Sequence, residues 1–287
     1  MEIGIFAKTF MRPTLGATLD AVAAHGISCV QFNMACAGLP SLPSQIDAAL
    51  SAEIRSVLES RQLRMAAVSG TFNMIHPDLA RRQAGLARLR TLAAACHDLG
   101  TSVITLSTGT RDPDDMWRRH PANDSPEAWR DLLVALSQAL TIAEEHRVTL
   151  AFEPEVSNVV DSAAKGRQLL DELQSPYLKV VMDGANLFHV GELPRMREIL
   201  DEAFALLGDE IVLAHAKDLS HDGDAGHEAA GTGMLDYDHY LALLRAVGFR
   251  GPLILHSLTE DQVAQSVAFL VEKGVALGAG GDAHAIF

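Results

Sequence analysis

The sequence predicts an α/β fold in which eight parallel strands alternate with eight helices and close into a (β/α)8 barrel. Two observations predict this fold. Short apolar runs recur along the chain, as expected of strands that are buried on both faces. Helical segments lie between these runs, and no shift in composition marks a linker. We therefore expect one barrel domain over residues 1–287, a size that is usual for a single barrel.

The first four strands and three helices precede residue 108. Strands are expected at residues 3–7, 27–32, 64–69 and 102–107, and helices at residues 13–25, 45–61 and 79–99. Gly26 directly follows the first helix and is a natural stop for it. Pro40 and Pro43 mark the loop before the second helix, and Gly100 separates the third helix from the fourth strand.

The second half of the chain repeats the pattern four more times. Strands are expected at residues 149–153, 179–183, 211–215 and 252–256, and helices at residues 127–147, 159–174, 192–207, 237–247 and 260–274. An open, doubly wound sheet is the alternative fold for such an alternation. No glycine-rich nucleotide fingerprint follows the first strand, which favours the barrel.

The longest connection, residues 108–126, follows the fourth strand. Loops of this length inside compact domains are usually functional lids or disordered segments. Trp117 favours a lid, because disordered segments are poor in aromatic residues. Arg111, Arg118 and Arg119 of this loop either contact a substrate or pair with the aspartates of the same loop, and the sequence leaves both interpretations open.

Four of the later strands end in a residue able to hold a metal ion: Glu153, Asp183, His215 and His256. These residues are 30, 32 and 41 positions apart, about one strand–helix–strand unit each time. Because side chains alternate across a strand, each shares a face with the residue two positions earlier. A parallel barrel would bring all four together at its carboxyl-terminal mouth. One such residue alone is better explained as a polar strand end satisfied by a nearby loop, but four in register favour a site.

Composition and charge argue against several classes of function. The formal net charge of −14 counts against a nucleic-acid partner, because binding to a phosphate backbone needs clustered lysine and arginine. The chain starts without a basic-then-apolar leader and has no apolar run of membrane-spanning length, so we expect no membrane partner and a cytoplasmic protein. Cys29, Cys36 and Cys96 follow no metal or disulfide spacing and are expected to be buried and reduced.

Five motifs flank the predicted ligand positions. Residues 152–154 (Phe-Glu-Pro), 182–186 (Met-Asp-Gly-Ala-Asn) and 214–218 (Ala-His-Ala-Lys-Asp) follow three successive strands, and residues 231–236 and 248–255 precede the last position. Each motif is weakly specific alone. Their order and spacing over essentially the whole chain resemble the sugar phosphate isomerase/epimerase family. The resemblance implies a xylose isomerase-like TIM barrel, related in fold to endonuclease IV.

The resemblance also implies a metal site. In similar enzymes a glutamate, an aspartate, a histidine and a final glutamate hold one divalent metal, usually manganese, magnesium, cobalt or zinc. By position, Glu153, Asp183 and His215 would be the first three ligands. His256 stands where the family has the final glutamate, which also serves as an acid/base group there. Asn186 stands where family members often place a histidine that contacts the substrate.

Histidine at position 256 changes the charge and the metal preference of such a site. With Glu153, Asp183 and two neutral histidines, a divalent ion would leave a net charge of about zero, instead of about −1 with three carboxylates. A more electropositive centre polarises a bound carbonyl group more strongly. Imidazole also shifts preference from magnesium toward transition metals. We therefore hypothesise one divalent metal ion held by Glu153, Asp183, His215 and His256, with manganese, cobalt or zinc favoured over magnesium.

The activity implied by the resemblance is isomerisation or epimerisation of a small carbohydrate, keto-sugar or polyol through an enediolate. Glu153 is the candidate base, with Glu155 as a second candidate, and His256 is the group that returns the proton, because imidazole titrates near neutral pH. Loss of a β-hydroxyl group from the same enediolate would give dehydration of a keto-inositol, as in inosose dehydratases of similar fold. The candidate substrate-binding residues are Asn73, His76, Arg111, Glu155, Asn186 and Lys217.

Two other functions compete with this one. An endonuclease IV-like phosphodiesterase needs a multi-metal cluster and a basic surface, and both Asn186 and the net charge of −14 count against it. A barrel that has lost catalysis and serves as a ligand-binding protein is the other, and His256 is its best support. Similar enzymes are often dimers or tetramers, so the resemblance implies that this protein forms a homodimer or a homotetramer.

Overall fold

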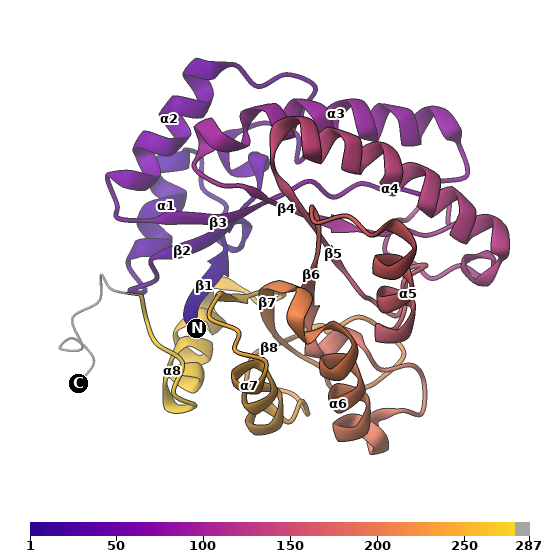
Figure 1. Ribbon diagram of the computed structural model, residues 1–287. Helices are drawn as coiled ribbons and strands as arrows, with labels where there is room; N and C mark the ends of the chain where they lie inside the picture. Colours follow the sequence, from indigo (N-terminus) through magenta and orange to yellow (C-terminus); the bar gives the residue numbers. More distant parts are fainter. Residues whose placement is uncertain (279–287) are drawn as a thin grey trace.

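The computed structural model describes residues 1–278, in which the strands form a closed barrel (Figure 1). The parallel strands are β1 (Glu2–Phe6), β2 (Cys29–Phe32), β3 (Arg64–Ser69), β4 (Val103–Ser107), β5 (Thr149–Glu153), β6 (Leu178–Asp183), β7 (Ile211–Asp218) and β9 (Pro252–Leu255). Each strand pairs with its neighbours in the order β6-β5-β4-β3-β2-β1-β9-β7, and an additional pairing of β6 with β7 closes the ring. The predicted barrel of eight parallel strands is confirmed for the part of the chain that the structure describes.

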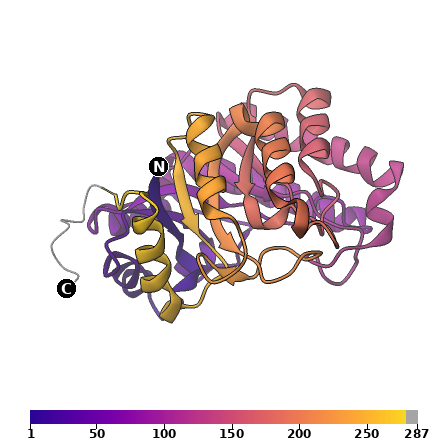
Figure 2. The ribbon, with the colours of Figure 1, turned by 90° about the horizontal axis from the view of Figure 1, so that it is seen from below.

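The helices form a ring around the strands (Figure 1). They are α1 (Leu15–Ala23), α2 (Ala48–Glu59), α3 (Leu79–Leu99), α4 (Pro126–His146), α5 (Ala163–Leu173), α6 (Met196–Leu207), α7 (Tyr237–Ala246) and α8 (Val263–Glu272). Short 3-10 helices lie at Ala7–Thr9, Met34–Ala37, Pro121–Asp124, Gly184–Asn186, Leu193–Arg195, Gly208–Glu210 and Glu260–Gln262. Seen from below, α7 and α8 lie over the outer side of the strands (Figure 2). None of the helices in residues 1–278 is both long and apolar enough to cross a membrane.

The helix boundaries follow from capping side chains and left-handed residues. Six helices begin after a residue whose side chain accepts a hydrogen bond from a backbone N–H of the first turn: Thr14, Asp47, Asp78, Ser125, Ser162 and Asp236. Such caps satisfy donors that the helix itself leaves unpaired. Gly100, at φ 89°, ends α3 in the conformation that glycine adopts without strain. The predicted helix over residues 79–99 therefore matches α3 at both ends.

The main differences from the predicted elements lie around β7 and β9. Strand β7 runs three residues further than predicted, and its end pairs antiparallel with a short strand, β8 (Glu228–Ala229), in the connection between β7 and α7. Strand β9 ends at Leu255, so His256 lies just outside it, although the prediction made it the last strand residue. The next residue, Ser257, has a φ of 55°, which turns the chain away from the strand direction.

Small and branched apolar residues fill the inside of the barrel. Seven of them form a cluster separate from the core beneath the helices: Cys29, Ala66, Ala67, Ala151, Val181, Leu213 and Ile254. Four of these residues stand two positions before a predicted metal ligand, as strand alternation requires. Gly4 is also needed inside the barrel, because a Cβ atom there would lie 2.5 Å from Ile254 Cδ1. The prediction of which strand face looks inward is thus confirmed for β5, β6, β7 and β9.

Tyr240 of α7 joins two strand ends from outside the barrel. Its side chain is fully buried, and its hydroxyl group lies 3.0 Å from the carbonyl oxygen of Met182 and 3.1 Å from that of His215. These carbonyl groups belong to β6 and β7, next to Asp183 and at His215 itself. The tyrosine therefore helps to fix the spacing of the two strands where their polar side chains emerge.

We predict that Tyr240→Phe lowers the free energy of unfolding by about 1–2 kcal/mol, because it leaves a buried hydrogen-bonding site unsatisfied. Thermal unfolding followed by circular dichroism measures this as a fall in Tm of roughly 2–6 °C. Tyr177→Phe is the matched control, since Tyr177 is only partly buried, and it should change stability by less than about 0.5 kcal/mol. Equal effects of the two variants would contradict a specific role for the Tyr240 hydroxyl group.

Candidate metal centre

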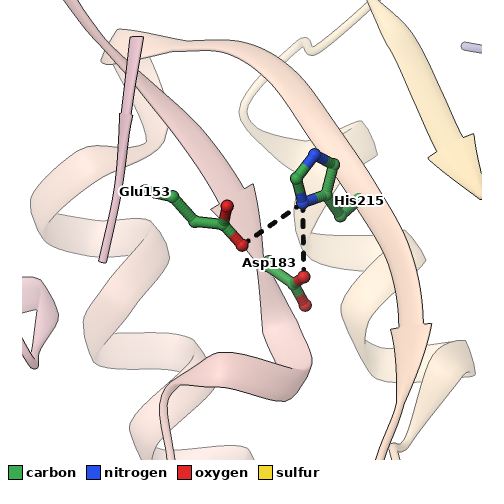
Figure 3. Close-up of side chains that lie close together, drawn as sticks. All are labelled: Glu153, Asp183 and His215. Carbon is green, nitrogen blue, oxygen red and sulfur yellow. Dashed lines mark hydrogen bonds and ion pairs between the residues drawn. The ribbon is translucent and has the colours of Figure 1, made fainter. Parts of the chain in front are cut away.

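Three of the four predicted ligands meet at the carboxyl-terminal end of the barrel (Figure 3). Glu153 ends β5, Asp183 ends β6 and His215 lies in β7, and one ligand atom of each lies within 4.8 Å of those of the others. His215 Nδ1 is 3.2 Å from Glu153 Oε1 and 3.3 Å from Asp183 Oδ2. Asp183 and His215 are also direct partners in the β6–β7 register. The strand pairing itself therefore sets their approach.

Gln31 of β2 fixes the orientation of the His215 ring from the opposite side. Gln31 Oε1 lies 2.9 Å from His215 Nε2, and the Gln31 amide nitrogen lies within 3.5 Å of the hydroxyl groups of Ser69 and Thr105. In a neutral imidazole, an amide oxygen at Nε2 favours the tautomer that carries its proton there, so loss of the Nδ1 proton would leave a lone pair facing the two carboxylates. Sequence reasoning missed Gln31 as a site residue, although its position near the end of a predicted strand was a signal.

Asn186 holds Glu153 in place. The Asn186 amide nitrogen donates to Glu153 Oε1 at 2.6 Å, while its own oxygen accepts a hydrogen bond from the backbone N–H of Gly226 at 2.8 Å. Asn186 is fully buried and does not line the cavity described below. It was predicted to bind substrate; in this structure it contacts the carboxylate instead, and direct substrate contact stays a prediction.

Lys217 neutralises the most deeply buried carboxylate. Lys217 Nζ lies 3.0 Å from Asp183 Oδ2, and both side chains are buried. Burial alone would lower the pKa of Lys217, but Asp183, Glu153 and Glu155 raise it above its ordinary value. Burial alone would raise the pKa of Asp183, but Lys217 and His215 hold it below its ordinary value. Asp183 and Lys217 therefore carry opposite full charges at neutral pH.

The same carboxylates act on His215. Burial alone would lower the pKa of its imidazole, but Glu153 and Asp183 raise it to about 9. A proton on Nδ1 therefore takes the place between the two carboxylates that a metal cation would take. This pattern of charge is what a cation-binding cluster produces when its ligands face one another.

His256 lies beside this three-residue set rather than within it. Its ring stacks on that of His215, with the centroids 4.8 Å apart and the planes at 24°, and also on Phe6, at 4.7 Å and 18°. Its Nδ1 lies 3.1 Å from the hydroxyl group of Ser257. Burial, together with the nearby cations of His215 and Lys217, lowers the pKa of His256 well below its ordinary value, so the ring is neutral. Coordination by His256 stays a prediction.

A cavity of about 630 Å³ opens above these residues. Glu153, Glu155, His215, Lys217 and His256 line it on the barrel side, and Met116 and Trp117 of the β4–α4 loop line it further out. Trp117 is 55% exposed. The predicted lid segment therefore reaches the cavity, through its apolar residues.

Glu155 is buried at the floor of the cavity, not exposed on a surface loop. Its carboxylate accepts a hydrogen bond from the Asn158 side chain at 2.9 Å. Burial, followed by repulsion from Glu153, raises the pKa of Glu155 to about 7. Sequence reasoning ranks Glu155 only as a second candidate base, because strand alternation does not reveal how the chain folds back after a strand.

The other predicted substrate contacts lie elsewhere in the structure. Arg111 bonds to Asp131 at 2.6 Å and to the carbonyl oxygen of Ile75 at 3.0 Å, so its guanidinium group is engaged away from the cavity. Asn73 and His76 line a neighbouring cavity, described below. Arg118 forms two hydrogen bonds with Asp112, at 2.6 and 2.8 Å. Substrate contact by Arg111, Asn73 and His76 stays a prediction.

The three central residues fit a divalent metal ion. Asp183 Oδ2 is buried, and although Lys217 Nζ is near, the angles give this oxygen no hydrogen-bond partner among residues 1–278. Gln31 leaves His215 Nδ1 directed at the same point as the two carboxylates. Two carboxylates and one imidazole, with further positions open, form a donor set that suits manganese, cobalt or zinc.

Comparisons with known proteins place the chain in a family. Residues 19–273 match the family described as "Xylose isomerase-like TIM barrel". A curated relative, "Putative L-ribulose-5-phosphate 3-epimerase SgbU" of Haemophilus influenzae, is 26% identical over 127 residues. That match covers 42% of this chain and 42% of the relative, so the chain spans less than half the length of this curated relative.

Solved structures show the same fold over nearly the whole chain. The 3-keto-D-glucoside 4-epimerase YcjR of E. coli has a TM-score of 0.71 at 16% identity, with 95% of this chain and 99% of that chain covered. The IolI protein, solved with a zinc atom, has a TM-score of 0.72 at 16% identity, with 95% and 98% covered. The family match covers residues 19–273, and the strands form the closed barrel of that family. The chain therefore belongs to the xylose isomerase-like TIM barrel family.

Proposed function

We propose that the protein is a metal-dependent isomerase or epimerase of a small carbohydrate, keto-sugar or polyol, with dehydration of a keto-inositol as a sub-case. The observation that carries this proposal is the meeting of Glu153, Asp183 and His215 beside a cavity of about 630 Å³, which Glu153 and His215 line. The names of the relatives support it, since the curated one is an L-ribulose-5-phosphate 3-epimerase by name and one solved neighbour is a keto-glucoside epimerase.

The metal ion would be held by Glu153, Asp183 and His215. His256 is the proposed fourth ligand, and without coordination it would lie next to the ion. When bound, such an ion supplies a Lewis acid that polarises a carbonyl group and acidifies the adjacent C–H bond. Asp183 and His215 are fully buried and serve to hold charge. Glu153 is 20% exposed toward the cavity, which makes it the carboxylate of the set that a substrate reaches.

Proton transfer is assigned to groups that line the cavity. Glu153 accepts the proton from the carbon next to the carbonyl group, and Asn186 holds its Oε1 through the 2.6 Å hydrogen bond. His256 is the second group, because its neutral ring lines the same cavity beside His215 and can accept a proton and pass it on. Lys217 and Glu155 lie at the floor, where an ammonium group and a carboxyl group can bind the oxygen atoms of a substrate.

We predict that the wild-type protein binds one equivalent of manganese, cobalt or zinc, and that Asp183→Asn weakens this binding about 100-fold or more. Isothermal titration of metal into chelator-treated protein measures both values. On the geometry of the structure, His256→Gln should weaken binding less than about tenfold, because its ring is stacked beside the set.

Two controls make this titration decisive. His239→Gln removes a histidine of α7 that pairs with Asp201 and lies outside the set, so it should leave metal affinity unchanged. His215→Gln should weaken metal binding in the same way and leaves Lys217 paired with Asp183. It therefore tests the site even if Asp183→Asn folds poorly. A protein that stays metal-free with all three ions would refute the site.

We predict metal-dependent exchange of a carbon-bound proton when ketoses or keto-inositols are incubated with the protein in deuterated water. Glu153→Gln should slow this exchange by roughly 10²–10⁴-fold, because it removes the accepting group. His256→Gln should slow net epimerisation or isomerisation by about 100-fold. Proton NMR of the sugar follows both reactions, with His239→Gln as the control.

The outcome that would contradict catalysis is a protein that binds metal and sugar but exchanges no proton across the whole panel. That result would favour the alternative function, a barrel that binds a ligand without transforming it.

A further inference from the structure

A second cavity of about 540 Å³ adjoins the one above the metal centre. It lies over the start of α3, between the β3–α3 and β4–α4 loops. Ser41, Thr71 and Met116 line both cavities. A molecule bound at the metal centre could therefore extend past these three residues into the second space, which we name the side cavity.

One wall of the side cavity is aromatic and flat. Phe72 lines it, and its ring is packed so closely on α3 that a Cβ atom on Gly85 would lie 2.1 Å from Phe72 Cδ2. Glycine at position 85 is thus what allows the ring to lie on the helix. Leu42 and Met116 extend this apolar surface. Such a wall suits the C–H face of a sugar ring.

Two arginines on one face of α3 supply hydrogen-bond donors. Arg81 and Arg88 both line the side cavity and are exposed, and neither forms an ion pair with a carboxylate in residues 1–278. Arg81 Nη1 is placed by His76 Nε2 at 3.2 Å and by the carbonyl oxygen of Pro113 at 3.5 Å. Most of the donors of these two guanidinium groups remain available to a ligand.

Two carboxylates of the β4–α4 loop also line the side cavity. They belong to Asp114 and Asp115, which form no ion pair with a described residue, although Asp115 Oδ1 accepts a hydrogen bond from the backbone N–H of Trp117 at 2.9 Å. Their loop is held by Asp112, which accepts hydrogen bonds from both of their backbone N–H groups at 2.9 Å. Carboxylates without a cation partner repel a phosphate or carboxylate ligand, whereas their remaining lone pairs accept hydrogen bonds from hydroxyl groups. Arginines, carboxylates and an aromatic wall together match an uncharged polyhydroxy ring better than an anion.

We propose that the side cavity is a subsite for a second, uncharged sugar ring, so that the substrate is a glycoside whose reacting ring lies at the metal centre and whose other ring lies on Phe72. This inference rests on the proposed function for the reacting ring. It names the substrate class as a two-ring carbohydrate without a phosphate group.

The experiment compares the binding of two-ring and one-ring sugars to variants of α3. Ala84 is exposed and lines the side cavity, so Ala84→Trp fills that space. Ala87→Trp is the matched control, because Ala87 is an exposed alanine of the same helix that does not line it. The probes are maltose, cellobiose and lactose, together with the methyl glycosides of glucose and galactose, and binding is measured by saturation-transfer NMR and calorimetry.

We expect at least one disaccharide to bind wild type and Ala87→Trp at least about tenfold more tightly than the methyl glycosides. Ala84→Trp should abolish this difference and leave binding of the methyl glycosides unchanged. Equal binding of one-ring and two-ring sugars to the wild type would overturn the proposal. The proposal would also be overturned if millimolar inorganic phosphate displaced the disaccharide from the wild type but not from Arg88→Ala. That result would favour an anion site.

Because the readout is binding, its failure is distinct from failure of the proposed function. A difference between the probes that persists in Asp183→Asn, combined with no proton exchange in the wild type, would support the subsite and refute the isomerase. Proton exchange on free ketoses without a preference for two rings would do the reverse.

Discussion

The constraint on which the site depends is the packing of two carboxylates, one buried and one partly exposed, around one imidazole nitrogen. Asp183 is 1% exposed, and its Oδ2 and Glu153 Oε1 lie 3.3 and 3.2 Å from His215 Nδ1. Carboxylates in this position lose hydration and repel each other, so positive charge has to accompany them. The Lys217 ammonium group and the His215 imidazole supply it here, and a divalent cation among the same oxygens would supply it more strongly. This need explains why a lysine is buried at the mouth of the barrel.

The barrel preorganises these charged side chains, because it fixes their positions before any ligand binds. Asp183 and His215 face each other because their strands are paired in register, and Tyr240 holds the same two strand ends from outside. Gln31 and Asn186 then set the orientations of His215 and Glu153 through single hydrogen bonds. Charged groups held in this way need little reorganisation when a cation or substrate arrives.

Sequence reasoning reached the architecture and the three residues of the candidate site because both depend on periodic patterns. Apolar runs reveal strands, and alternation within a strand reveals which face looks inward, so Glu153, Asp183 and His215 could be placed together. His256 shows the limit of this reasoning: alternation holds only while the strand continues, and β9 ends one residue earlier. Gln31 and Asn186 depend on side-chain contacts between segments that are distant in sequence, which no local pattern encodes.

The residues of the side cavity lie on loops and on the start of α3, whereas the candidate metal centre lies on strands. The candidate metal centre is built on β5, β6 and β7, where a displacement of any of its three residues would disturb the barrel itself, so this part of the site has little freedom to vary. Phe72, Arg81 and Asp114 lie on the β3–α3 loop, the start of α3 and the β4–α4 loop, and replacing them leaves strand pairing intact. The mixed charge of the side cavity, rather than the candidate metal centre, is therefore where we expect the substrate preference of this protein to be decided.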